Sequence, residues 1–218
     1  GNYIGTDSTG NASMGQGQNG IQVGFFGNYN MIGDGTVGGR NICSGNSYAG
    51  IGLNSGDHTI VLGNYAGLGA DGSTVIPNSG GIYVANSKYA RVGDGTVGGR
   101  NVVSGNNFDG VTLKAKSDSS EVLGNYIGLD ATGTLARPNP YGVLIFDTTK
   151  YARIGDGTPG GRNIISGNSG NGVMIDGLGN EFNSVSGNYV GTDPTGFTAI
   201  PNGDHGIVIW NDARHNLI

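Results

Sequence analysis

The chain has 218 residues, of which 46 are glycine and only 12% are charged, and its formal net charge is −5. Glycine at roughly three times its average share disfavours long helices, because it costs about 1 kcal/mol relative to alanine inside a helix. The 11 lysines and arginines are scattered and the apolar runs are short, so we expect neither a nucleic-acid partner nor membrane insertion. The single cysteine, Cys43, excludes an internal disulfide and is expected in an apolar core.

An internal repeat organises the chain. The opening "GNYIGTDSTG" returns as "GNYAGLGADG" at Gly63, "GNYIGLDATG" at Gly124 and "GNYVGTDPTG" at Gly187, with spacings of 62, 61 and 63 residues. A fixed period of this size is typical of a solenoid, in which each unit stacks on its neighbours. We therefore expect a single solenoid domain over residues 1–218, made of repeats 1–62, 63–123 and 124–186 and a partial repeat 187–218, and forming a segment of a longer array.

The next pattern along each unit is a β-strand signal, glycine followed by apolar, any and apolar residues. It first appears as "GIQV", where Ile21 and Val23 must point to one face of a strand and Gln22 to the other. The same inward pairs recur as Ile51/Leu53, Ile82/Val84, Val111/Leu113, Val143/Ile145, Val173/Ile175 and Ile207/Ile209. These pairs predict aliphatic columns inside an all-β stack.

A glycine-rich motif, "GDGTVGGRN" at Gly33, repeats identically at Gly93 and with one proline at Gly155. Each copy holds an aspartate and an arginine: Asp34/Arg40, Asp94/Arg100 and Asp156/Arg162. Because the pair is duplicated, we interpret it as a structural loop in which the aspartate accepts backbone N–H groups and the arginine bridges to an aspartate. The alternative is a calcium site at Asp34, Asp94 and Asp156, although each loop offers one carboxylate and Ca²⁺ prefers six to eight oxygens.

Gly-Asn pairs mark the bends between strands, as in "NICSGN" and "TIVLGN". The spacing between them alternates between about 19 and about 42 residues, which predicts one short and one long coil per repeat. Three coils per repeat would result if the two excursions of the long coil supplied strands of their own. We expect the asparagines to occupy one recurring bend and to bond to the neighbouring coil: Asn2, Asn46, Asn64, Asn106, Asn125, Asn168 and Asn188.

The combination of "NxxSGNxxxGVxI" with "GNYxGTDxTG" resembles the right-handed parallel β-helix repeats of the pectate-lyase-like superfamily, found in large secreted and surface bacterial proteins. The resemblance covers the whole chain and implies a right-handed parallel β-helix. It says little about function, because that superfamily includes polysaccharide lyases, hydrolases and epimerases as well as phage tail spikes and non-catalytic surface proteins.

Unrepeated residues are the better candidates for binding. The stretch "WNDARHN" gathers Trp210, Asp212, Arg214 and His215, a set that suits a sugar, with the indole stacked on a pyranose and charged groups bonded to its hydroxyls. His215 nevertheless aligns with Tyr89 and Tyr151, so its position is also a repeat site for a ring. Tyrosine columns at Tyr3, Tyr65, Tyr126 and Tyr189, and at Tyr29, Tyr89 and Tyr151, are expected to stack on each other rather than to contact polysaccharide.

Two functions follow from these patterns. The first is a non-catalytic extracellular or cell-surface repeat protein, such as a stalk, adhesin or filament, that associates end to end with flanking repeats or copies of itself. The alternative is a polysaccharide-active enzyme or glycan-binding β-helix, with Asp204, His205, Asp212, Arg214 and His215 as its best residues and Tyr83 or Tyr151 as partners. The sequence favours the first because it shows no convergent catalytic set, and it indicates no cofactor other than the calcium of the alternative above.

Overall fold

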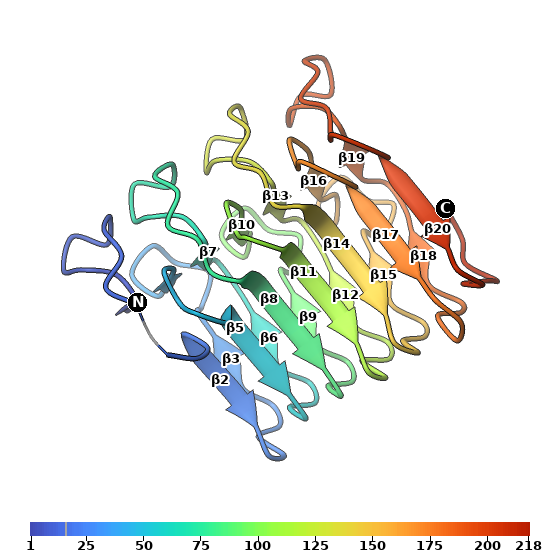
Figure 1. Cartoon of the computed structure of the whole chain (residues 1–218), viewed down its shortest axis with the longest axis horizontal. Helices are drawn as coiled ribbons and strands as arrows, with labels where there is room; N and C mark the ends of the chain where they lie inside the picture. Colours follow the sequence, from blue (N-terminus) through green and yellow to red (C-terminus); the bar gives the residue numbers. More distant parts are fainter. Residues whose placement is uncertain (16) are drawn as a thin grey trace.

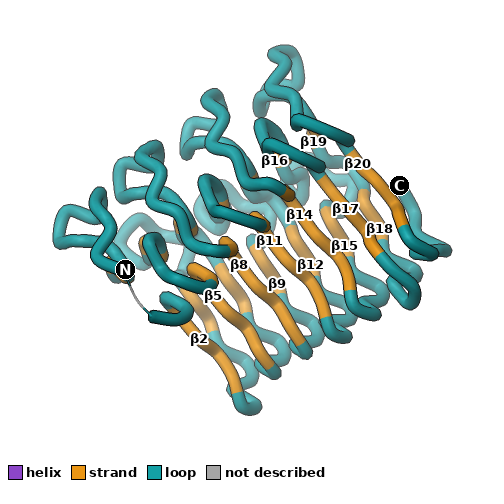
Figure 2. The backbone as a smooth tube through the Cα atoms, in the orientation of Figure 1, coloured by secondary structure: helices purple, strands orange, loops and turns teal. Residues whose placement is uncertain are grey.

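The apolar pairs and alternating runs of the sequence become short strands that lie parallel to one another in successive coils (Figure 1). The computed structural model describes residues 1–15 and 17–218. These residues form a parallel β-solenoid with no helix (Figure 2), in which each strand between the two ends of a sheet pairs with strands of the coils before and after it. Consequently, no helix long and apolar enough to cross a membrane occurs in the described part of the chain.

Three sheets run along the solenoid. The first consists of β1 (Tyr3–Ile4), β4 (Ile42–Cys43), β7 (Tyr65–Ala66), β10 (Val102–Val103), β13 (Tyr126–Ile127), β16 (Ile164–Ile165) and β19 (Tyr189–Val190). The second consists of β2 (Ile21–Gly24), β5 (Ala49–Asn54), β8 (Gly80–Ala85), β11 (Asp109–Lys114), β14 (Tyr141–Phe146), β17 (Val173–Asp176) and β20 (Ile207–Trp210). The third consists of β3 (Met31–Ile32), β6 (Ile60–Val61), β9 (Arg91–Val92), β12 (Glu121–Val122), β15 (Arg153–Ile154) and β18 (Ser184–Val185).

Each repeat contains two coils. In the first repeat β1, β2 and β3 make a long coil, and β4, β5 and β6 make a short one. The long coil carries both excursions: a hairpin closed by an antiparallel bridge between Thr6 and Ser13, and the loop at residues 33–40 between β3 and β4. Neither excursion adds a strand to the three sheets, so the three-coil alternative is excluded. Four hairpins project from one side of the stack in Figure 1, one from each long coil.

The expected aliphatic columns fill the interior. Ile21, Ile51 and Ile82 are paired in register, and the column continues through Val111, Val143, Val173 and Ile207. Between the end coils these side chains are fully buried. Burial of each is worth about 1.5–3 kcal/mol relative to exposure. Cys43 lies in the same core, where burial raises the pKa of its thiol to about 12, which confirms its expected apolar role.

The asparagines form two ladders rather than one. In the first, each Nδ2 donates to Oδ1 of the asparagine in the next coil at 2.8–3.2 Å. Its members are Asn2, Asn41, Asn64, Asn101, Asn125, Asn163 and Asn188. The second ladder, at the next corner, has Nδ2–Oδ1 distances of 2.8–3.0 Å and consists of Asn46, Asn78, Asn106, Asn139, Asn168 and Asn202.

The single bend expected from the Gly-Asn pairs is therefore wrong. Asn64 and Asn125 precede a strand of the first sheet, whereas Asn46 and Asn106 follow one. Alternate rungs are filled by asparagines outside the Gly-Asn motif, for example Asn101 in the first ladder. Both corners require an asparagine side chain in every coil. The backbone N–H and the Nδ2 group of each asparagine donate to the Oδ1 atom of the asparagine in the next coil, as those of Asn101 do to Asn125.

Replacement of Asn125 by alanine tests the first ladder. The change leaves the buried N–H and Nδ2 groups of Asn101 without their acceptor, and removes the bond from Asn125 Nδ2 to Val92 O. We expect the free energy of unfolding to fall by about 2–4 kcal/mol, measured by chemical denaturation. Asn107→Ala, at an exposed position of the preceding coil, is the control and should change the free energy of unfolding by no more than about 0.5 kcal/mol. Equal losses in the two variants would contradict the ladder's role.

Candidate functional site

The repeated glycine-rich loops are closed by their aspartates. Asp34 Oδ1 accepts hydrogen bonds from Thr36 N at 2.8 Å and Thr36 Oγ1 at 2.7 Å, and Thr36 Oγ1 accepts one from Gly39 N at 3.0 Å. A Cβ at Gly39 would collide with the Asp34 carboxylate, which explains the glycine. The copies at Asp94 and Asp156 have the same bonds. The hydrogen bonds from Thr36 and Thr158 lower the pKa values of Asp34 and Asp156.

The arginines of these loops reach forward to the next coil. Arg40 Nε donates to Gly63 O at 3.1 Å, and its guanidinium lies over the Tyr65 ring with Cζ 4.3 Å from the centroid. Arg100 covers Tyr126 at 4.1 Å and Arg162 covers Tyr189 at 4.0 Å in the same way. Among the described residues these arginines form no ion pair with an aspartate. The expected Asp–Arg bridge is therefore wrong, and cation–π contacts replace it.

The two expected tyrosine columns differ in whether their rings stack. Tyr65 pairs in register with Ile42 and Val102, so Tyr3, Tyr65, Tyr126 and Tyr189 lie two coils apart and do not stack on each other. Tyr29 and Tyr89 do belong to a stack, because His58 lies between them with 4.8 Å between neighbouring ring centroids. The expectation of stacking holds only for the second column.

The hairpins use the same aspartate chemistry. Asp130 Oδ1 accepts from Thr132 Oγ1 at 2.9 Å and from the backbone of Thr134 at 3.0 Å. Asp7 and Asp193 have equivalent bonds. In the second repeat Gly69 occupies the aspartate position, and Asp71, two residues later, closes the hairpin through Thr74. The hairpin aspartates thus have structural partners.

No group of three or more histidine, cysteine, aspartate or glutamate side chains within the described ranges is placed to hold a metal ion. The loop carboxylates at Asp34, Asp94 and Asp156 point into their own turns, where they accept from threonine. The calcium site there stays a prediction, and it would need backbone oxygens to supply most of the ligands.

The proposed glycan cluster near the C-terminus is divided between two sides of the solenoid. Trp210 ends β20 and meets His205 edge to face at 6.2 Å, and His205 Nδ1 lies 3.0 Å from Asp204 Oδ1. Arg214 and His215 lie around the next corner. Asp212, with a φ of 64°, is exposed at that turn. The six residues from Trp210 to His215 therefore do not form one binding surface.

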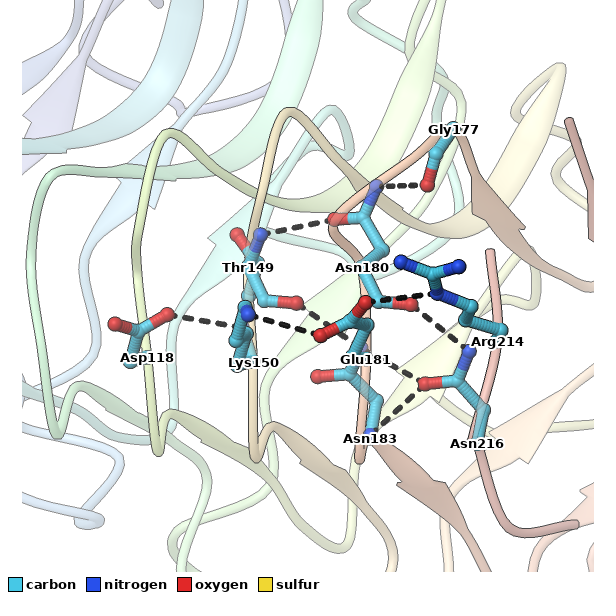
Figure 3. A network of polar contacts seen from close by, with 9 residues as sticks. All are labelled: Asp118, Thr149, Lys150, Gly177, Asn180, Glu181, Asn183, Arg214 and Asn216. Atoms are coloured by element: carbon cyan, nitrogen blue, oxygen red, sulfur yellow. Dashed lines mark hydrogen bonds and ion pairs between the residues drawn. The ribbon is translucent and has the colours of Figure 1, made fainter. Parts of the chain in front are cut away.

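Arg214 belongs to a polar network on the third-sheet side (Figure 3). Glu181 Oε1 accepts from Arg214 Nε at 3.0 Å, and its Oε2 accepts from Lys150 Nζ at 2.9 Å. These contacts lower the pKa of Glu181, mainly through the hydrogen bond from Lys150. Lys150 N in turn donates to Asp118 Oδ1 at 2.9 Å. The network ties four coils together along one corner, and His215 beside it stacks on Phe182 at 5.4 Å.

A cluster of unrepeated polar and aromatic residues lies instead on the outer face of the second sheet. Lys114, at the end of β11, places its Nζ 4.9 Å from the Phe146 ring centroid and 5.3 Å from that of Tyr83. Tyr83 meets Tyr48 edge to face at 5.7 Å. Asp109, at the start of β11, accepts from Thr112 Oγ1 at 2.8 Å through Oδ2. We call Tyr48, Tyr83, Asp109, Lys114 and Phe146 the outer-face cluster.

Burial raises the pKa values of two members of this cluster, Asp109 and Tyr83. Desolvation raises the pKa of the Asp109 carboxyl above its ordinary 3.8, against a smaller lowering by Thr112. Burial also raises the pKa of Tyr83, and a hydrogen bond with Tyr83 raises that of Tyr48. A cavity of about 150 Å³ adjoins Asp109, Tyr48 and Tyr83, and a wider one of about 410 Å³ lies on the Lys114 side of the two tyrosines.

The cluster offers a carboxyl group with a raised pKa, two phenols and a cation on one face. Such a set can hydrogen-bond and stack on a sugar, and the carboxyl could donate a proton. Of its members, the sequence analysis named only Tyr83. The sequence signal that could have identified the others is a polar or charged residue at a strand position where the neighbouring coils have a small or neutral one. Asp109 occupies the position of Ala49 in β5 and Gly80 in β8. Lys114 occupies the position of Asn54 and Ala85 in the same strands.

Comparison of the chain with models of known protein families, with curated proteins and with solved structures finds no match. The geometry described above is therefore the basis for any functional proposal.

The raised pKa of Asp109 predicts a pH-dependent effect of Asp109→Asn. Because the folded-state pKa lies above that of the unfolded chain, wild-type Asp109 favours folding below pH 3.8 and loses that contribution as the pH rises through the folded pKa. The variant should therefore gain stability relative to wild type as the pH rises from 3 to 7. Unfolding by denaturant across this range measures the gain, with exposed Asp212→Asn as control. A difference that is independent of pH would contradict the burial of this carboxylate.

Proposed function

We propose that the chain is a structural, non-catalytic repeat segment of an extracellular or cell-surface protein, in which the solenoid acts as a stiff spacer such as a stalk, adhesin or filament. The observation that carries the proposal is that repeated polar side chains bond within the stack. The asparagines bond to asparagines one coil away, and the loop arginines bond to the next coil. Residues used in this way hold the stacked coils together, and their recurrence in each repeat supports a scaffold role.

The ladders also give the stack a direction. Between the end rungs, each asparagine accepts through Oδ1 from the preceding coil and donates through N–H and Nδ2 to the following one. A coil placed before β1 would donate to Asn2 Oδ1, and a coil placed after β19 would accept from Asn188. The two edges are thus complementary to further coils added head to tail.

The hairpins favour a short coil as the partner at both edges. Hairpins two coils apart already touch, because Ala70 N donates to Gly10 O and Ala131 N to Gly72 O, each at 2.9 Å. Two long coils in direct contact would therefore bring their hairpins into the same space. The coils that begin at β1 and β19 are both long. A flanking repeat fits these edges better than the edge of a second copy, so we propose flanking repeats as the end-to-end partners.

An added short coil tests this proposal. Residues 93–123, which contain one loop and one short coil, can be appended after Ile218 in the repeat register. We expect the extension to fold on the edge and to stabilise the protein, with each kcal/mol gained raising Tm by about 2–4 °C. The control carries alanine in place of the appended copies of Asn101 and Asn106. An extension that stays unfolded, leaving Tm unchanged, would overturn the proposal, and repeating the measurement in calcium and in EDTA tests the cation prediction.

The outer-face cluster supports a second candidate function, glycan binding or polysaccharide cleavage. This is the function class implied by the resemblance to pectate-lyase-like repeats, and Lys114 beside Tyr83 suits a sugar that carries a carboxylate. Asp109 would supply a hydrogen bond or a proton. The residues involved occur once, as expected for a site rather than a scaffold.

Titration of a uronic-acid oligosaccharide by calorimetry tests the second candidate. We expect Lys114→Gln to weaken binding about tenfold, since it removes the cation, and Lys116→Gln, at an exposed position nearby, to leave it unchanged. Product release, followed by reducing ends and by ultraviolet absorbance of unsaturated sugars, distinguishes cleavage from binding. Absence of binding, or equal binding by both variants, would dismiss this candidate, whereas cleavage lost in Asp109→Asn would overturn the non-catalytic proposal.

A further inference from the structure

One column on the surface has a left-handed backbone in every coil. Its seven members follow the second sheet at the corner before the third, and all have φ between 56° and 59°. They are Tyr29, His58, Tyr89, Ser119, Tyr151, Phe182 and His215. Because the backbone is the same at each level, the side chains leave the solenoid in the same direction, one above another.

The rings of this column form two separate stacks. Tyr29, His58 and Tyr89 have centroids 4.8 Å apart and planes within 12° of parallel. Tyr151, Phe182 and His215 have centroids 5.4 Å apart and planes within 10° of parallel. Of the seven members, only Ser119 lacks a ring. Two parallel stacks therefore face each other across the level of Ser119.

The gap between the Tyr89 ring and the Tyr151 ring has room for one further ring stacked between them. Tyr89 and Tyr151 are two coils apart, about 9.6 Å from the rise between neighbouring strands. A flat ring placed midway would lie about 4.8 Å from each wall, the spacing already found in the first stack. A surface groove of about 440 Å³ leads along His58 and Tyr89 to Ser119. We propose that the Tyr89–Ser119–Tyr151 slot binds a single flat aromatic ring.

The charges beside the slot select the ring's substituent. Glu121, two residues after Ser119, accepts from Arg91 Nε at 3.0 Å and lies 3.3 Å from Arg153 Nη2. One carboxylate shared by two half-exposed guanidinium groups leaves one positive charge on the Glu121 side of the slot, whereas the carboxylate of Asp118, the residue before Ser119, is held by Lys150 N at 2.9 Å. Lys150, the residue before Tyr151, is paired with Glu181. The slot therefore favours an aromatic carboxylate over an aromatic amine, and the ligand class we assign is a small aromatic acid.

The test uses 4-hydroxybenzoate as the probe with the full chain, followed by NMR of the tyrosine ring protons. We expect millimolar binding, with upfield ring-current shifts at Tyr89 and Tyr151. Cyclohexanecarboxylate has the same charge without a flat ring, and tyramine has a ring with the opposite charge. Both should bind at least tenfold more weakly.

Ser119→Tyr supplies the decisive variant, because it fills the slot with a ring that the other six positions show to be compatible with this backbone. It should abolish binding and raise Tm by joining the two stacks, whereas Ser119→Ala should bind within threefold of wild type. Should Ser119→Tyr misfold, Arg153→Gln serves instead and should weaken binding of the acid severalfold at low salt. Undiminished binding by the folded variants, equal binding of cyclohexanecarboxylate, or the absence of ring-current shifts would overturn the proposal.

Discussion

The structure depends on one repeated hydrogen bond, the donation of an asparagine amide in one coil to the amide of the next. Backbone pairing between strands covers only two residues per coil in the first and third sheets, so the corners on either side of the first sheet need another source of order. The two ladders provide it, since each asparagine also holds the backbone N–H of its neighbour. Buried amides are tolerated there because every rung satisfies the one before it.

This constraint divides the residues into two classes. Those that repeat are committed to the stack: asparagines to the ladders, aspartates to turns closed by threonine, and loop arginines to the tyrosine of the following coil. Those that do not repeat have no equivalent in the neighbouring coil. The outer-face cluster and Ser119 both belong to the second class, one as an addition to a plain sheet face and the other as an omission from an aromatic column. A solenoid therefore reveals candidate sites where its own periodicity is broken.

The errors of sequence interpretation have a common cause. Arg40 was expected to reach an aspartate because the two lie in one repeated motif, and Asn46 was expected to share a corner with Asn64 because both follow a glycine in the same pair. In a solenoid the nearest neighbours are instead one coil away, about 23 to 39 residues along the chain. Trp210 and Arg214 illustrate the reverse case, since a corner separates them although only three residues lie between them. The outer-face cluster was missed for the same reason, as Tyr48, Tyr83 and Lys114 come from three different coils.

The sequence by itself determined the architecture. The sequence has a period of about 62 residues, apolar residues that alternate with polar ones as in Ile21-Gln22-Val23, and few helix-forming stretches. These features predict a stack of parallel coils, because each pair of apolar residues can be buried only against its copies in the other coils. The tertiary structure decided which side chains meet. Coil height, corner position and the shared left-handed backbone place His58 between Tyr29 and Tyr89, and Lys114 between Tyr83 and Phe146. These contacts follow from the stacking of coils on one another, which no local pattern of residues contains.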